Sequence, residues 1–165
     1  MKSHRLTWLV VLIALSAAAF AQSDAQKSFE KLKTLAGSWQ GTFAGSPMQA
    51  TLRVTSMGNA IEHEMKGEGP DDPITMFYLD GDRLLLTHYC DAGNRPRMVG
   101  KLSPDGKTIE FEFLDVADYN GSTQIGHMQH AVFTLIDANH HTEDWTFYLE
   151  GKPPMIAHLD MLRTK

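Results

Sequence analysis

The stretch KLSPDGKTIEFEFL, residues 101–114, contains the pattern that decides the fold. Its second half, IEFEF at 109–113, alternates isoleucine and phenylalanine with glutamate. Successive side chains of a β-strand point to opposite faces, so this alternation is typical of a strand with one buried face. The segment SPDGK at 103–107 has the turn chemistry that joins neighbouring antiparallel strands. The stretch therefore predicts a β-hairpin in an antiparallel sheet.

The same two-residue period recurs along the chain, with turn signals about every ten residues, as in all-β domains. We expect about ten strands, at 38–43, 49–55, 60–66, 74–79, 83–90, 97–102, 108–114, 127–136, 141–149 and 155–162. The polar segment 116–125 is expected to be a longer loop. An open sheet of this length would leave two edges unpaired, so we predict a single closed antiparallel β-barrel.

One helix is expected before the first strand. Ser23, with glutamine three residues later, forms a capping-box pattern, and Phe29, Leu32 and Leu35 follow at helical spacing before Gly37. We expect Gly37 to end this short amphipathic helix, which is placed to plug one end of the barrel.

The first 21 residues have the pattern of a secretory signal peptide. Lys2 and Arg5 precede an apolar run at 6–20, and the run ends in a small-x-small cleavage pattern at 19–21. The run is shorter than the ~20 apolar residues that a transmembrane anchor needs. We therefore expect cleavage after Ala21, export to the periplasm or the extracellular space, and a single domain at 22–165.

The net charge and the cysteine content restrict the classes of partner and of covalent cross-link that the chain can have. The formal net charge is −5, and it becomes −7 when Lys2 and Arg5 leave with residues 1–21. This acidity argues against nucleic acid as a partner, and no membrane span is expected after processing. Cys90 is the only cysteine, so no disulfide forms within the chain. The sequence leaves the oligomeric state open.

The entry into the first strand, LAGSWQG at 35–41, carries a Gly-x-Trp-x-Gly motif at Gly37, Trp39 and Gly41. In this position the motif resembles the calycin superfamily, which includes lipocalins, fatty-acid-binding proteins and nitrobindin-type haem barrels. The chain looks most like a bacterial family of exported calycin-like domains of unknown function, because it also has the HYC, GN and PRM elements at 88–98. The resemblance implies a ligand-binding barrel.

Two positions differ from the nitrobindin-type pattern. Those proteins extend the opening to a third glycine, where this chain has Phe43, and they ligate haem iron with a histidine near the last strand. The final strand here offers only His158, which alternation places on the solvent side.

The segment LTHYC at 86–90 brings the lone cysteine close to a histidine. Alternation with the neighbouring leucines predicts that His88 and Cys90 face the interior near the barrel rim, and Arg97 is expected to return a positive charge to the same opening. Because His88 and Cys90 are two residues apart on one face of a strand, their side chains are expected to lie ~7 Å apart, which is too far for direct proton transfer between them. The alternative is a hydrogen-bonded interior histidine beside a cysteine that fills space.

In the ninth strand His141, Glu143, Trp145 and Phe147 share one face, which its aromatic residues mark as interior. Glu143 then either points into the cavity, where it would pair with Arg97 or a ligand, or lies hydrated at the open end. A metal site would require His63, His88 and His127 to converge in the fold, because no local spacing brings three ligands together.

We therefore expect an exported protein that binds a small apolar or amphipathic molecule inside the barrel, without catalytic residues, metal or a resident cofactor. The predicted ligand-binding residues are Trp39, Met76, Tyr78, His88, Cys90, Arg97, His127, Glu143 and Trp145. Three alternatives stay open: a haem-binding barrel, a hydrolase or isomerase using His88 and Glu143, and a packed barrel whose outer face binds a protein.

Overall fold

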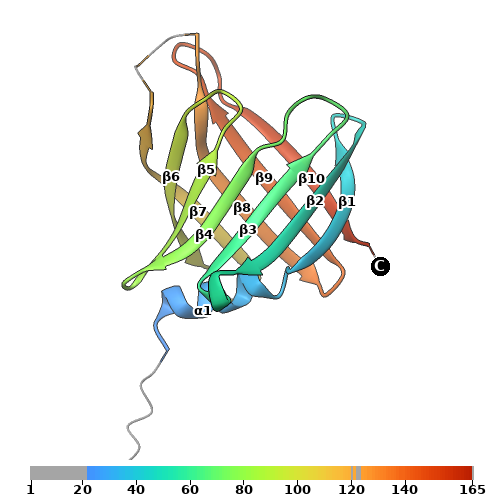
Figure 1. The fold of residues 1–165 in the computed structure, drawn as a ribbon, viewed down its shortest axis with the longest axis vertical. Helices are drawn as coiled ribbons and strands as arrows, with labels where there is room; N and C mark the ends of the chain where they lie inside the picture. Colours follow the sequence, from blue (N-terminus) through green and yellow to red (C-terminus); the bar gives the residue numbers. More distant parts are fainter. Residues whose placement is uncertain (1–21, 120, 122–123, 165) are drawn as a thin grey trace, which may run out of the picture.

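The protein is a closed ten-stranded antiparallel β-barrel with one helix, as a computed structural model describes it for residues 22–119, 121 and 124–164 (Figure 1). The predicted fold class is confirmed. The predicted signal peptide, residues 1–21, lies outside the described residues. The elements are α1 (Asp24–Lys33), β1 (Gly37–Phe43), β2 (Ser46–Thr55), the 3-10 helix η1 (Ser56–Gly58), β3 (Ala60–Lys66), β4 (Ile74–Asp80), β5 (Arg83–Tyr89), β6 (Arg95–Leu102), β7 (Thr108–Ala117), β8 (His127–Asp137), β9 (His140–Tyr148) and β10 (Met155–Arg163).

The barrel closes where the first strand meets the last. Consecutive strands pair as hairpin neighbours from β1 to β10, and β1 pairs on its other side with β10, in a register that sets Trp39 opposite Arg163. Each strand therefore has a neighbour on both sides, so backbone hydrogen bonding continues around the ring and leaves no edge strand. We call the β1–β10 pairing the seam.

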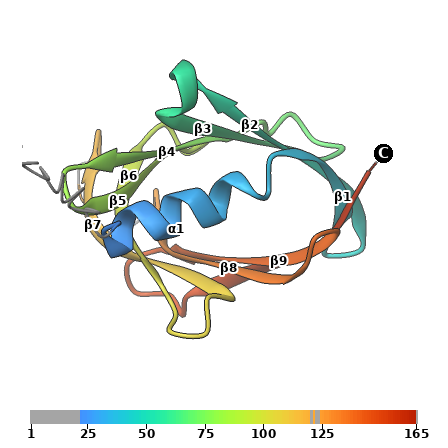
Figure 2. The ribbon, with the colours of Figure 1, turned by 90° about the horizontal axis from the view of Figure 1, so that it is seen from below.

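The helix lies across one end of the barrel (Figures 1 and 2). The Ser23 hydroxyl accepts a hydrogen bond from the Gln26 backbone N–H at 3.2 Å, which confirms the predicted start of α1. Phe29 and Leu32 are buried in the core of the barrel. The apolar face of α1 thus closes this end, as predicted.

The predicted end of the helix is wrong. The helix ends at Lys33, and tight turns follow in which the N–H groups of Leu35 and Ala36 reach the carbonyls of Leu32 and Lys33. Gly37 is instead the first residue of β1, and its φ of +141° favours glycine. A Cβ at this position would overlap the guanidinium of Arg163.

Arg163 ties the helix to the seam. Its Nη1 donates to the Ala36 carbonyl at 2.7 Å, its Nη2 to the Thr34 carbonyl at 3.0 Å and its Nε to the Ala138 carbonyl at 2.9 Å. The guanidinium also lies 4.1 Å from the centre of the Trp39 ring. The Gly-x-Trp-x-Gly motif is thereby explained, since Gly37 makes room for the guanidinium and Trp39 stacks under it.

The half of the interior next to α1 is filled by side chains. Phe77, Phe111 and Phe133 are fully buried, and their ring centres lie 5.4 to 6.0 Å apart. Aromatic rings at these separations contribute packing energy beyond the area they bury.

None of the helices in the described part of the chain is long and apolar enough to cross a membrane.

We predict that Gly41→Ala weakens the seam. A Cβ at Gly41 would overlap the backbone carbonyl of Asp160 on β10, so the strands must move apart. We expect a loss of about 1–3 kcal/mol in the free energy of unfolding, measured by urea titration. Gly69→Ala is the control, because the nearest atom to its new methyl is 4.0 Å away. Equal stability of the two variants would contradict a close-packed seam.

Candidate functional site

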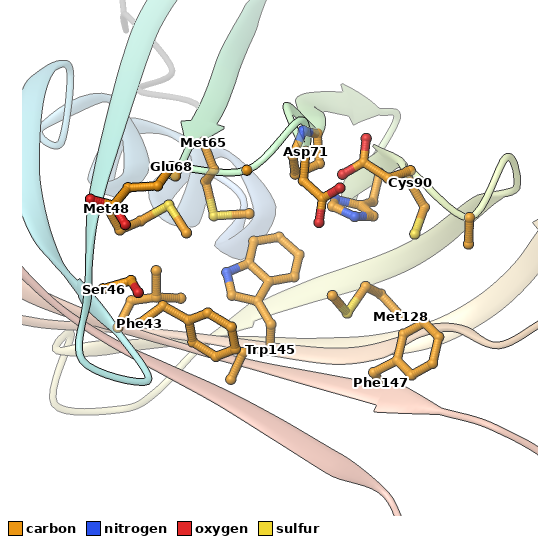
Figure 3. A pocket seen from close by; sticks show the side chains of 18 of the residues that line it. Phe43, Ser46, Met48, Met65, Glu68, Asp71, Cys90, Met128, Trp145 and Phe147 are labelled. Atoms are coloured by element: carbon orange, nitrogen blue, oxygen red, sulfur yellow. The ribbon is translucent and has the colours of Figure 1, made fainter.

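The half of the barrel opposite α1 contains a pocket of about 450 Å³, which we call the mouth pocket (Figure 3). The hairpins and loops that follow β1, β3 and β5 surround it. Its apolar lining consists of Phe43, Pro47, Met48, Met65, Pro73, Ala92, Met128, Trp145, Phe147, Ala157 and Leu159. Trp145 projects among the methionines, with Met128 and Phe147 on one side and Met48 and Met65 on the other (Figure 3).

Polar groups in the mouth pocket lie mainly in its loops. They belong to Ser46, Glu68, Asp71, His88, Cys90 and Asp91. Three of the six are carboxylates, and one, His88, is buried on a strand. The pocket thus combines an apolar interior with an acidic opening.

His88 occupies the interior position predicted for it. Its Nδ1 lies 2.8 Å from the Thr75 hydroxyl on β4, and its ring centre lies 5.2 Å from that of Trp145. Burial, together with a smaller effect of the charge on His63, lowers the pKa of His88 to about 4. The imidazole is therefore neutral at pH 7.

Cys90 is a free thiol that directly follows β5 and lines the mouth pocket. Burial raises the pKa of this thiol, and the charges of Asp91 and Asp71 raise it further, against a lowering by the backbone N–H of Ala92. Asp71 and Cys90 lie on the same side of the pocket (Figure 3). A nucleophilic cysteine requires a lowered pKa, so this environment disfavours covalent catalysis.

Glu143 lies inside the barrel, 1 % exposed, and is enclosed by partners. Its Oε1 accepts from His141 Nε2 at 2.9 Å and lies 3.4 Å from His63 Nε2, while its Oε2 accepts from the indole N–H of Trp145 at 2.9 Å. Burial alone raises the pKa of this carboxyl, but the charge of His63 and the hydrogen bond from His141 outweigh it and hold the pKa well below its usual range.

The predicted interior position of Glu143 is confirmed, but the hydrated alternative and the pairing with Arg97 are wrong. It is neither hydrated at the opening nor paired with Arg97, because two histidines and an indole from the interior satisfy it. Glu143 is not among the residues that line the mouth pocket. Glu143 instead holds the indole ring of Trp145, which does line the pocket. Because the indole N–H is bonded to Glu143, the ring presents only carbon atoms to the pocket.

Of the predicted ligand-binding residues, the structure brings His88, Cys90 and Trp145 together in the mouth pocket. Trp39 lies deeper, beside α1, where its indole N–H donates to the Leu35 carbonyl at 2.8 Å and its ring meets His141 edge-on at 4.2 Å. It belongs to the closed end of the barrel and has no part in the pocket lining.

The positions expected for Met76, Tyr78 and Arg97 are wrong, because these side chains lie on the outer face. In β4 it is Thr75 and Phe77 that are buried, while the Tyr78 hydroxyl meets the Thr87 hydroxyl at 3.0 Å outside the barrel. Arg97 is exposed and pairs with Asp115, its Nε donating to Oδ1 at 2.7 Å. It brings no positive charge to the opening.

His127 is displaced from the pocket by a β-bulge. Met128 pairs with Phe147 and His130 with Thr146, so Gln129 is an extra residue on β8. Met128 consequently lines the pocket, and the His127 ring lies among Phe113, Tyr119 and Tyr148. The convergence of His63, His88 and His127 that a metal site would require does not occur.

The sequence interpretation missed most of the pocket lining. Alternation marks Phe147 as interior but does not show which end of the barrel it faces, Met48 and Met65 are not among the predicted pocket residues, and Glu68 and Asp71 lie in the β3–β4 loop. A usable signal existed, because in an antiparallel barrel every second connection opens at the same end. Tracing the 67–73 and 91–94 connections together would have predicted an acidic opening.

We predict that His88 makes stability depend on pH. The folded pKa of about 4 lies below the ordinary value of 6.5, so between these values the unfolded chain binds the extra proton. The free energy of unfolding therefore falls as pH falls, by about 2 kcal/mol from pH 7 to pH 5. His88→Gln should flatten this dependence in urea titrations, and His158→Gln, at an exposed site, should not. If the free energy of unfolding of both variants depended on pH in the same way, His88 would not be the source of this dependence.

We also predict that Glu143→Ala costs about 3–5 kcal/mol of unfolding free energy, because it leaves buried His63 and His141 without their shared partner. The adjacent Asp144→Ala is the control. It removes a partly exposed pair with His158 and should cost less than about 1 kcal/mol. A cost for Glu143→Ala no larger than that of its neighbour would show that the carboxylate does not organise the interior.

No protein-family model and no curated protein matches the chain. Among solved structures, that of Rv2717c from M. tuberculosis is similar at a TM-score of 0.58, with 13 % sequence identity over 84 % of this chain and 98 % of that chain. A protein with unknown function from the DUF3598 family of Nostoc punctiforme matches at 8 % identity over 83 % and 99 % of the two chains, with a TM-score of only 0.26. The first likeness shows the fold alone.

Proposed function

We propose that this protein binds a small apolar or amphipathic molecule in the mouth pocket. The observation that carries the proposal is a hollow of about 450 Å³, lined mainly by methionine, aromatic and aliphatic side chains, beside a packed core formed by other described residues of the barrel. This volume lies in the range of small-molecule sites. Burial of ligand surface would supply the affinity, at roughly 25 cal/mol per Å².

Two further parts of the proposal rest on the sequence. We propose that the barrel is calycin-like, an inference that the Gly37-x-Trp39-x-Gly41 opening and the preceding helix support. We also propose export to the periplasm or the extracellular space, on the pattern of residues 1–21. A free thiol in place of a disulfide is compatible with either location.

His88 offers the pocket a neutral imidazole, but the charges of the other polar groups do not fit haem. The haem carboxylates favour basic partners, whereas the pocket presents Glu68, Asp71 and Asp91. The histidine of the final strand, His158, is exposed and bonds Asp144 at 2.6 Å on the outer face. We therefore derive no function through haem.

An acid–base pair of His88 and Glu143 gains no support either. Glu143 is enclosed by His63, His141 and Trp145, and its pKa is lowered, so it is an ionised carboxylate out of reach of the pocket. A general base must contact the proton it removes. Binding without turnover is the function that the geometry favours.

We predict that the neutral fluorophore N-phenyl-naphthylamine binds saturably with enhanced emission. Ala157→Phe should weaken this binding by about tenfold or more, because the added ring occupies the pocket. Ala138→Phe places the same ring on an exposed turn at the closed end and serves as the control. Absence of saturable binding, or equal binding by the two variants, would contradict the proposed pocket.

A further inference from the structure

We propose that the mouth pocket selects amphipathic ligands with a positively charged head group, such as alkylammonium compounds, and discriminates against carboxylates such as fatty acids. This inference rests on the proposed function and specifies the ligand class for the same pocket. It follows from the charges of the groups that line it, from a buried histidine with a free nitrogen, and from an aromatic ring at its centre.

The charge of the pocket lining is negative. The pocket is lined by Glu68, Asp71 and Asp91, and among the described residues that line it there is no lysine or arginine. The ion pairs of the described residues include none of these three carboxylates. The opening therefore holds negative charge that a bound cation would neutralise.

The arginines of β6 do not neutralise the negative charge at the opening. Arg95 pairs with Asp118, and Arg97 pairs with Asp115 on the outer face. Burial raises the pKa of Asp91 most, and the charge of Asp71 raises it further, against a lowering by the backbone N–H of Asp72.

His88 places an uncharged polar group in the pocket. It is 1 % exposed and lines the pocket, its Nδ1 is used by Thr75, and no hydrogen bond from the described residues reaches its Nε2. Among the described residues the buried side-chain atoms without a hydrogen-bond partner are His63 Nδ1 and Nε2, Asn94 Oδ1 and His141 Nδ1, so Nε2 of His88 is not one of them and remains open to a water or ligand atom in the pocket. Because His88 is neutral at pH 7, it offers an anionic head group no charge.

An apolar surface with an aromatic ring lies beside the carboxylates in the pocket lining. The indole N–H of Trp145 is engaged by Glu143, so the ring meets the pocket with carbon only. Aromatic faces attract cations, and quaternary ammonium groups in particular. Met48, Met65 and Met128 surround the ring with flexible thioethers that adapt to an alkyl chain (Figure 3).

The test compares three ligands with one tail: octyltrimethylammonium, octanol and octanoate, titrated by calorimetry at pH 7 and low salt. We expect the ammonium compound to bind about tenfold tighter than octanol or better, and octanoate to bind most weakly. Added salt should narrow the differences, because screening weakens charge attraction.

A charge variant locates the effect. Asp71→Asn should lower the ratio of ammonium to octanol affinity by about threefold or more. Asp82→Asn changes the net charge equally but lies in the exposed β4–β5 turn at the closed end, and should leave the ratio unchanged.

The outcomes separate the two proposals. Equal binding of all three ligands, or tighter binding of octanoate, overturns the charge selection and leaves the apolar pocket standing. Binding of none of the three, together with no saturable fluorophore binding, overturns the proposed function itself. An unchanged affinity ratio in Asp71→Asn would overturn the placement of the head group at the opening.

Discussion

The pairing of β1 with β10 is the constraint on which the rest of the structure depends. An antiparallel sheet of ten strands encloses an interior only when its two edge strands pair, and β1 and β10 do so through backbone hydrogen bonds. The Arg163 guanidinium on β10 also donates to the Ala36 carbonyl in the turn that follows the helix. Once the ring is closed, each side chain faces either the enclosed volume or the outer face. The helix then seals one end, and the hollow remains at the other.

Within that enclosed volume a single carboxylate organises the polar groups. Placing Glu143 away from water is costly unless its oxygens are satisfied, and His63, His141 and Trp145 together supply that satisfaction. The same contacts hold Trp145 in one orientation between the filled half and the hollow half. The charge that stabilises the interior thus also shapes the surface that a ligand would meet.

The sequence predicted the strands and the closed barrel well, because alternation and turn residues are local signals. It predicted the pocket less well, for three physical reasons. The run ITMFYL at 74–79 has no charged side chain to mark its outer face, and its small polar residue Thr75 faces inward, so alternation wrongly favours an inward Met76 and Tyr78. The bulge at Gln129 reverses the alternation for His127. The partners of Glu143 come from different strands, and pairing at such distances in the chain leaves no local pattern.

The β8 bulge has a consequence for how such a pocket diversifies. If Gln129 paired with Phe147 without the bulge, alternation would turn Gln129 and His127 inward in place of Met128. A shift of one residue in register would exchange a thioether for an amide and an imidazole, with the barrel and its seam untouched. The choice between the bulged and the regular register of β8 therefore sets the chemistry of this part of the pocket lining while the scaffold stays the same.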